Sequence, residues 1–162
     1  MKQVITFLVL SFLIAGSVYA AQIKSNETVC NANELLTYNT SRYVDAQVKS
    51  TDGGDAQILF DAQTIQIDKQ TKIITVWTVW LESPKGRAKL MSVSGGVENF
   101  AYIKRFTTYD YSARRASTKS TLFMNCDGST IYNAPPDEWK NISPDSMDEM
   151  ILQYIMQKYS LK

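Results

Sequence analysis

A ten-residue run, KIITVWTVWL at residues 72–81, constrains the fold of this chain more than any other stretch. Successive side chains of a β-strand point to opposite faces of the sheet, so Ile73 and Trp77 would share one face and Ile74 and Val76 the other. Both faces of the run are then largely apolar. This pattern is typical of a strand in the middle of a sheet, and the sequence therefore predicts a central strand that is covered on both sides.

Several other stretches have the composition of strands separated by turns. The run before the central strand, ILFDAQTIQI, is joined to it by DKQT, which is short and polar enough for a hairpin. The remaining breaks are a charged loop, ESPKGRAK at 82–89, the segment SGGVE, and the turn residues Asp127-Gly128. Five or six antiparallel strands are expected in succession with no helix between them, and the main predicted strands are 58–67, 72–81, 99–111, 118–126 and 129–134.

The last part of the chain has a helical pattern instead. A helix could start with Ser143 as the cap and Pro144 in the first turn, or with Ser146 and Glu149 as a capping box. An apolar stripe follows, and a stripe of this kind usually faces a core, although it could also dock on a partner. The expected fold class is α+β, mainly β, with an antiparallel sheet of five to six strands and a C-terminal helix packed across one face. The apolar stripe comprises Met147, Met150, Ile151, Tyr154 and Ile155.

The first twenty residues have the three parts of an export signal. Lys2 gives a positive start, Val4 to Ile14 form an apolar run too short to span a bilayer, and Val18-Tyr19-Ala20 fits a cleavage site. An uncleaved anchor is the alternative. Lipid attachment at the position after LIAG is excluded chemically, because Ser17 has no thiol to acylate. The protein is therefore expected to be exported to the periplasm, the cell surface or the medium.

Cleavage after residue 20 would leave a chain without net charge, because Lys2 is the only charge removed and 16 basic residues then face 16 acidic ones. A neutral chain has no overall attraction for nucleic acid, and none is expected as a partner. No membrane insertion is expected after cleavage. The length suits one domain at 42–160, preceded by an N-terminal segment at 21–41.

The chain has two cysteines, Cys30 and Cys126. In an exported protein they fold where disulfides form and persist. A bond between them would tether the N-terminal segment to the late strands, and closing so long a loop contributes on the order of 4–5 kcal/mol. A reactive free thiol and an intermolecular bridge are the alternatives.

Three segments carry a resemblance to a known family: LFDAQTIQIDKQTKIITVW, TTYDYSARR and DEWKNISPDSMDEMI. Over roughly residues 42–156 the chain resembles the surface-adhesin protein E family of bacterial exported proteins. The matching positions in the motifs of that family are Asp61, Thr64, Ile65, Val76, Trp77, Trp139, Ile142, Pro144 and Ser146.

This resemblance implies an antiparallel sheet with a C-terminal helix across one face. It also implies adhesion to host matrix proteins and plasminogen capture. In family members that carry a cysteine pair, a disulfide bond joins the helix to the sheet. Here the corresponding positions are Tyr111 and Ile155 or Met156, so both cysteines of that disulfide are absent.

The composition disfavours catalysis. The chain contains no histidine, which excludes Ser-His-Asp and Cys-His catalysis and imidazole metal ligands. The adjacent carboxylates Asp137/Glu138 and Asp148/Glu149 are typical of solvated turns and helix starts. The segment DGGD at 52–55 is too short for a calcium loop. We therefore expect no enzyme activity, no cofactor and no metal.

The remaining local feature is basic. Cations interleave with aromatic residues between positions 100 and 119, an arrangement that can bind anionic glycans or acidic protein surfaces. The alternative is that the aromatics face the core and the cations face water. The candidate binding residues are Lys104, Arg105, Arg114, Arg115 and Lys119, among Phe100, Tyr102, Phe106, Tyr109 and Tyr111.

Together these features favour an exported, non-catalytic, adhesin-like binding module for host matrix proteins, plasma proteins such as plasminogen, or other extracellular ligands. The alternative is a periplasmic accessory protein for assembly or stress that binds bacterial partners. A homodimer is also open, since sheet edges can pair between subunits.

Overall fold

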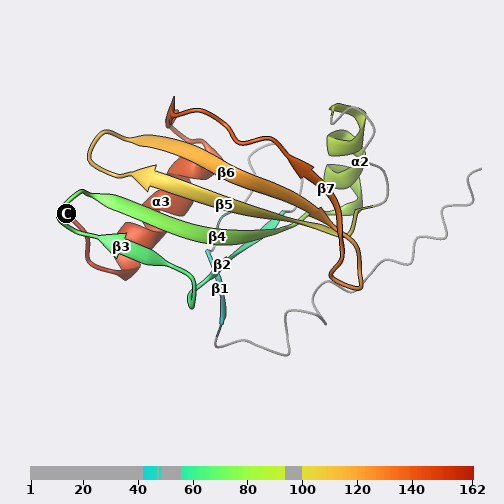
Figure 1. Cartoon of the computed structure of the whole chain (residues 1–162), viewed down its shortest axis with the longest axis horizontal. Coiled ribbons are helices and arrows are strands. Elements are labelled where there is room, and N and C mark those ends of the chain that lie inside the picture. Colours follow the sequence, from blue (N-terminus) through green and yellow to red (C-terminus); the bar gives the residue numbers. More distant parts are fainter. Residues whose placement is uncertain (1–41, 47, 49–55, 94–99) are drawn as a thin grey trace, which may run out of the picture.

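A computed structural model describes residues 42–46, 48, 56–93 and 100–162. Within this part the chain forms one antiparallel sheet with a helix lying across it (Figure 1). The strands run in the order β1-β2-β4-β5-β6-β7, with β3 paired to β4 and β8 paired to β6. The elements are β1 (Tyr43–Asp45), β2 (Gln57–Asp61), β3 (Gln66–Asp68), β4 (Ile73–Leu81), α2 (Pro84–Val93), β5 (Tyr102–Asp110), β6 (Arg115–Met124), β7 (Thr130–Ala134), β8 (Lys140–Asn141) and α3 (Met147–Lys158).

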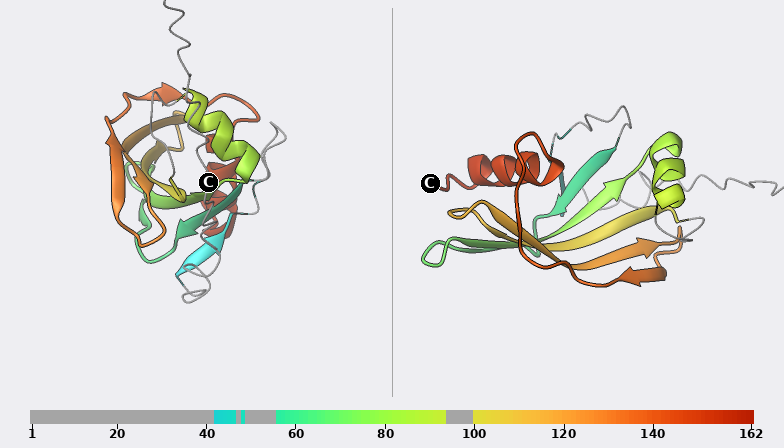
Figure 2. Two further views of the ribbon diagram at one scale, coloured as in Figure 1. Left: turned by 90° about the vertical axis from the view of Figure 1, so that its right-hand side faces the viewer. Right: turned by 90° about the horizontal axis from the view of Figure 1, so that it is seen from above.

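The predicted fold class is confirmed: the protein is α+β and mainly β, with a C-terminal helix on one face of the sheet. Within the described residues the sheet has eight strands, more than the five or six expected, because it also includes the short strands β1, β3 and β8. The sheet is strongly curved and bends around α3, and α2 lies at the opposite end from the C-terminus (Figure 2). No helix in the described part is long and apolar enough to cross a membrane.

The main core lies between α3 and the sheet. Ile151, Leu152 and Ile155 of α3 are fully buried, and they belong to one cluster with residues of β2 and β4 such as Phe60 and Val76. Burying aliphatic side chains of this size contributes about 1.5–3 kcal/mol each. The predicted stripe therefore faces the core. Leu152, which was not assigned to it, is as deeply buried as its neighbours.

The start of α3 follows the capping-box prediction. The Ser146 hydroxyl accepts a hydrogen bond from the Glu149 N–H, so Ser146 is the N-cap. The Glu149 carboxylate in turn accepts from the N–H of Asp145, whose φ is 59°. Pro144 and Asp145 form a turn before the helix and do not belong to its first turn. The other predicted start, with Ser143 as cap, is wrong.

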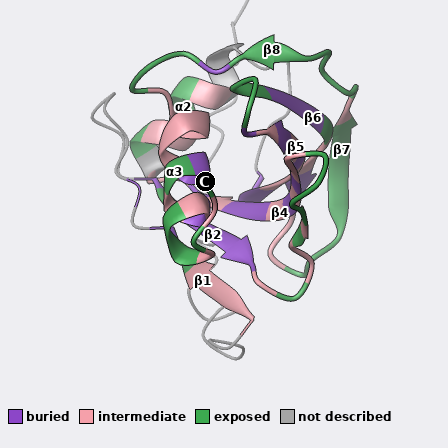
Figure 3. Cartoon of the chain, turned by 90° about the vertical axis from the view of Figure 1, so that its left-hand side faces the viewer, coloured by how far each residue is buried: buried purple, intermediate pink, exposed green. Residues whose placement is uncertain are grey.

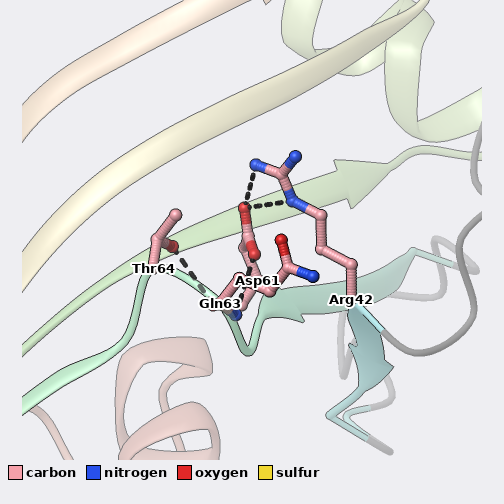
Figure 4. Close-up of polar contacts among 4 residues, drawn as sticks. All are labelled: Arg42, Asp61, Gln63 and Thr64. Atoms are coloured by element: carbon pink, nitrogen blue, oxygen red, sulfur yellow. Dashed lines mark hydrogen bonds and ion pairs between the residues drawn. The ribbon is translucent and has the colours of Figure 1, made fainter.

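The long strand predicted at 58–67 is divided by a turn after Asp61. Arg42 donates to Asp61 Oδ2 from Nε at 2.8 Å and from Nη2 at 2.6 Å, while Asp61 Oδ1 accepts from the N–H of Gln63 (Figure 4). The Asp61 carbonyl also accepts from the N–H and the hydroxyl of Thr64. A buried aspartate that bonds local backbone in this way favours a turn over a continued ladder. The chain therefore leaves β2 at Asp61 and returns to the sheet as β3.

The predicted charged loop at 82–89, and with it the absence of a helix between strands, is wrong. Residues Pro84–Val93 form α2 between β4 and β5. The Ser83 hydroxyl accepts from the N–H of Gly86 and its carbonyl accepts from the N–H of Arg87, so Ser83 caps a helix with proline in its first position. Leu90 packs against the cluster of Phe100, Ile103 and Phe123. That contact anchors the helix, whereas Gly86 and the charges suggested a loop.

The central strand β4 pairs with β2 and β3 on one side and with β5 on the other. On the face beneath α3, Ile74 and Val76 are buried. On the opposite face Val79 and Leu81 are buried in a second cluster with Leu59, Tyr102 and Met124, whereas Ile73, Thr75 and Trp77 are half-buried. The strand β4 is therefore buried on both faces only toward its C-terminal end.

The predicted hairpins at 68–71 and at Asp127-Gly128 are confirmed by the pairing of β3 with β4 and of β6 with β7. Gly128 has a φ of 82°, a conformation that glycine adopts without strain. Cys126 lies in this turn, packs against the second cluster and is not a free cysteine. The signal segment, residues 21–41 and Cys30 lie outside the described residues, so the Cys30–Cys126 bond stays a prediction.

Replacing Leu152 by alanine should lower the free energy of unfolding by about 2–5 kcal/mol, because it leaves a cavity beneath α3. The matched control is Gln153→Ala at the neighbouring exposed position, which should change stability by less than about 0.5 kcal/mol. Urea denaturation measures both. Equal stability of the two variants would contradict the packing described here.

Burial, with the nearby charge of Asp148, raises the pKa of Tyr109 well above its usual range. A folded pKa above the unfolded value of about 10 means that stability is fully present below that pH and is lost as pH rises through the folded pKa. In Tyr109→Phe the decline in unfolding free energy between about pH 9 and about pH 11 should be smaller than in the parent chain. An unchanged slope in Tyr109→Phe would contradict the burial of this hydroxyl.

Candidate functional site

The outer part of β6 carries two of the predicted cations. Phe106 of β5 pairs with Ser120 of β6, but Thr107 pairs with Thr118, so Lys119 is the extra residue of a β-bulge. A bulge twists a strand locally and redirects the side chain of the extra residue. Arg115 lies four residues earlier, at the start of the same strand. Both side chains are exposed.

The segment after β7 runs back along β6 and places a tryptophan beside these cations. The N–H of Asp137 donates to the Thr118 carbonyl at 2.8 Å, and the Ser117 hydroxyl donates to the Asp137 carbonyl at 2.8 Å. Further along, β8 pairs with Arg115 and Ala116. Trp139 lies between these two anchoring points. The segment from residue 135 to β8 is exposed and coloured green in Figure 3.

The indole of Trp139 lies beside the cationic groups of two neighbouring side chains. Its ring centroid lies 5.5 Å from Cζ of Arg115 and 5.4 Å from Nζ of Lys119. Even so, 41% of the residue is exposed, and the described part of the chain has few large apolar side chains so accessible. Cation–π contacts at exposed positions contribute about 0.5–1 kcal/mol each, enough to orient the ring without burying it.

An open hollow of about 540 Å³ adjoins the ring. We call the hollow together with the two cations and the indole the Trp139 surface. It presents an apolar ring, positive groups, and carboxylates at one edge. Its residues are Arg115, Ser117, Lys119, Pro136, Asp137, Glu138 and Trp139.

Asp110 holds Arg115 in place. The N–H of Ala113 and the hydroxyl of Ser112 both donate to Asp110 Oδ1, and Arg115 Nη2 lies 3.3 Å from Oδ2. The backbone N–H of Ala113 lowers the pKa of Asp110, and Ser112 and Arg115 lower it further. The carboxylate is therefore ionised at neutral pH and fixes the guanidinium beside Trp139.

The other predicted cations lie elsewhere. Lys104 pairs across from Val79 on the face opposite α3, with its Nζ 6.0 Å from the Tyr102 ring centroid. Arg105 lies on the face that α3 covers. Arg114, in the turn between β5 and β6, is ion-paired with Glu149 of α3. The structure thus brings together Arg115 and Lys119 and separates the other three.

Most of the aromatic residues in the predicted patch serve the core. Phe100, Tyr102, Tyr109 and Tyr111 are buried, and Phe106 stacks on Trp77 with ring centroids 5.0 Å apart. The alternative expectation, that these aromatic residues face the core, therefore agrees with the structure. Sequence reasoning did not identify Trp139 as a surface residue, although a tryptophan in the polar, proline-rich stretch APPDEWKN is a usable signal.

The described residues contain no cluster of three or more histidine, cysteine, aspartate or glutamate side chains that could hold a metal ion. The Trp139 surface has no nucleophile paired with a base. Its groups suit reversible contact: an apolar ring, two cations and backbone on a rigid sheet. Comparisons of the chain with family models, with curated proteins and with solved structures find no match.

The contact between Arg115 and Trp139 can be measured with a double-mutant cycle of Arg115→Ser and Trp139→Ala. We expect a coupling free energy of about 0.5–1 kcal/mol in urea denaturation, because the cation lies over the ring. The control cycle pairs Lys104→Ser with Trp139→Ala and should show no coupling, since Lys104 lies at the Tyr102 ring, six residues along β5 from Asp110, the partner of Arg115. Zero coupling in the first cycle would contradict the geometry of the site.

Proposed function

We propose that this chain is an exported, non-catalytic binding module that contacts a protein ligand through the Trp139 surface. The observation that carries the proposal is the half-exposed indole of Trp139 held between two cations beside an open hollow. Tryptophan and arginine are enriched among the residues that dominate binding energy in protein interfaces. A side chain already oriented before binding also loses less conformational entropy when the ligand arrives.

The charges of this surface indicate the kind of ligand. Arg115 and Lys119 lie beside the ring, with Arg115 also ion-paired to Asp110 at 3.3 Å and Asp137 ion-paired to Lys140 at 3.2 Å. An acidic group next to an apolar side chain on the ligand would find both a cation and the indole face. We therefore propose an acidic protein surface as the partner, and anionic glycans satisfy the same cations less completely because they lack the apolar group.

The identity of that partner rests on the resemblance to the surface-adhesin protein E family, which itself rests on short sequence motifs. It suggests host matrix proteins and plasminogen as candidates. Two positions agree with the resemblance. Members of that family that carry the cysteine pair have a disulfide at the positions of Tyr111 and Ile155, and here these two residues lie in one apolar core. Packing would then hold the helix where a covalent bond holds it in such relatives.

The test is surface plasmon resonance of the exported protein against immobilised host matrix proteins and plasminogen. Trp139→Ala should weaken binding about tenfold or more, and the double change of Arg115 and Lys119 to serine should weaken it and flatten its salt dependence. The matched control is Lys104→Ser, which removes a cation from the same sheet but six residues along β5 from Asp110, the partner of Arg115. If ligand binding is detected and all variants bind like the parent chain, the Trp139 surface is not the contact.

Fractionation of the producing cell separates the adhesin from the alternative of a periplasmic accessory protein. Protein at the surface or in the medium is the result expected for an adhesin. Confinement to the periplasm would overturn the host-ligand part of the proposal and direct the same binding variants to bacterial partners.

A further inference from the structure

A second cavity lies on the helix-covered face, between the sheet and the start of α3. It has a volume of about 140 Å³, roughly that of four or five water molecules at about 30 Å³ each. One wall comes from β5 and β6 and includes Arg105 and Thr118. The other comes from the chain around β8 and the first turn of α3, and includes Ser143, Ser146 and Asp148.

Arg105 is held rigidly in the wall formed by the sheet. Its guanidinium carbon lies 4.8 Å from the Trp80 ring centroid, and its Nη2 donates to Thr118 Oγ1 at 2.8 Å. The Trp80 ring is itself fixed, since its Nε1 donates to Thr78 Oγ1 at 2.9 Å. Within the described part of the chain, Arg105 forms no ion pair with a carboxylate. The planar fork of guanidinium donors matches a carboxylate.

The opposite wall carries the negative charge. Asp148 accepts a hydrogen bond at 3.1 Å from the hydroxyl of Tyr109, which is buried beneath α3. That bond occupies Oδ1 and leaves the other carboxylate oxygen available to a donor. Asp137 and Lys140 also line the cavity and are ion-paired with each other at 3.2 Å, so a plain anion next to Arg105 would still meet the Asp148 carboxylate across a narrow space. A plain cation would in turn meet Arg105.

We propose that this cavity binds a small zwitterion of the α-amino acid class, with its carboxylate on Arg105 and its ammonium group on Asp148. Such a molecule places opposite charges a few ångströms apart, which matches a cation and a carboxylate on facing walls. The hydroxyls of Thr118, Ser143 and Ser146 supply the neutral hydrogen-bonding groups between them. The volume of about 140 Å³ accommodates amino acids with small side chains, such as glycine, alanine and serine.

This site is distinct from the Trp139 surface. Asp137 lines both hollows, but the indole and its two cations do not line the smaller cavity. Binding of a small zwitterion should therefore survive Trp139→Ala. Loss of protein binding at the Trp139 surface and loss of amino-acid binding in the smaller cavity can therefore be measured independently.

Isothermal titration calorimetry on the exported full chain tests the proposal with glycine, L-alanine and L-serine as probes. Acetate and methylammonium, which each carry one of the two charges, are tested alongside. We expect the amino acids to bind at least about tenfold more tightly than either half-probe, since each half lacks one charge-assisted contact. Absence of binding by all three amino acids would overturn the proposal, as would equal binding of acetate and glycine.

Two variants locate the site, and one serves as the control. Arg105→Gln and Asp148→Asn should each weaken amino-acid binding about tenfold or more, and the amide introduced by the second change would still offer an oxygen to Tyr109. Lys104→Gln removes the neighbouring cation on the other face and should bind like the parent chain. If Arg105→Gln does not fold, Asp148→Asn and the comparison of glycine with acetate decide the outcome. Unchanged affinity in Asp148→Asn would overturn the assignment.

Discussion

The packing of α3 on the sheet is the contact on which the rest of this structure depends. Ile151, Leu152 and Ile155 meet a face of β2 and β4 that would otherwise expose a broad apolar surface. The sheet curves around the helix, and residues from β2 to the C-terminal turn join one core. Three further interactions fix the helix start: the Ser146 cap, the Arg114–Glu149 ion pair, and the hydrogen bond from Tyr109 to Asp148. Helix position and sheet curvature are therefore determined together.

That arrangement also determines where ligands can bind. From β7 the chain runs back along the outer edge of β6 to β8, and this path places Trp139 beside Arg115 and Lys119. The space left between this segment, β5 and the first turn of α3 is the cavity that Arg105 and Asp148 line. Both candidate sites thus result from one connection, the exposed segment between β7 and α3. A rigid sheet supports the first site and a buried hydrogen-bond network supports the second, so both sets of side chains are oriented before a ligand arrives.

Strong local patterns in the sequence predicted the fold well, and weak ones did not. The two-faced apolar run at 72–81 is the central strand, and the stripe from Met147 to Ile155 faces the core. The helix α2 was missed because Gly86 and several charges outweighed the Ser83-Pro84 start signal, although Leu90 finds a cluster to pack on. The break after Asp61 was missed because a side chain that bonds its own turn interrupts a sequence that otherwise fits one strand. For the candidate site, composition identified the cations of β6 but could not show which of them share a surface.

The sequence by itself determined the class of the fold, the position of the central strand, the capped helix at the end of the chain and the absence of histidine chemistry. Each of these follows from the period of apolar residues, from capping residues or from composition, all of which are local properties. Only the tertiary structure decided that Arg115 and Lys119 meet Trp139, that Arg114 is committed to Glu149, and that Arg105 faces a polar cavity. These outcomes depend on strand register, on the bulge at Lys119 and on the path of the chain along the edge of β6. Contacts between distant parts of the chain fix all three, and no short stretch of sequence encodes them alone.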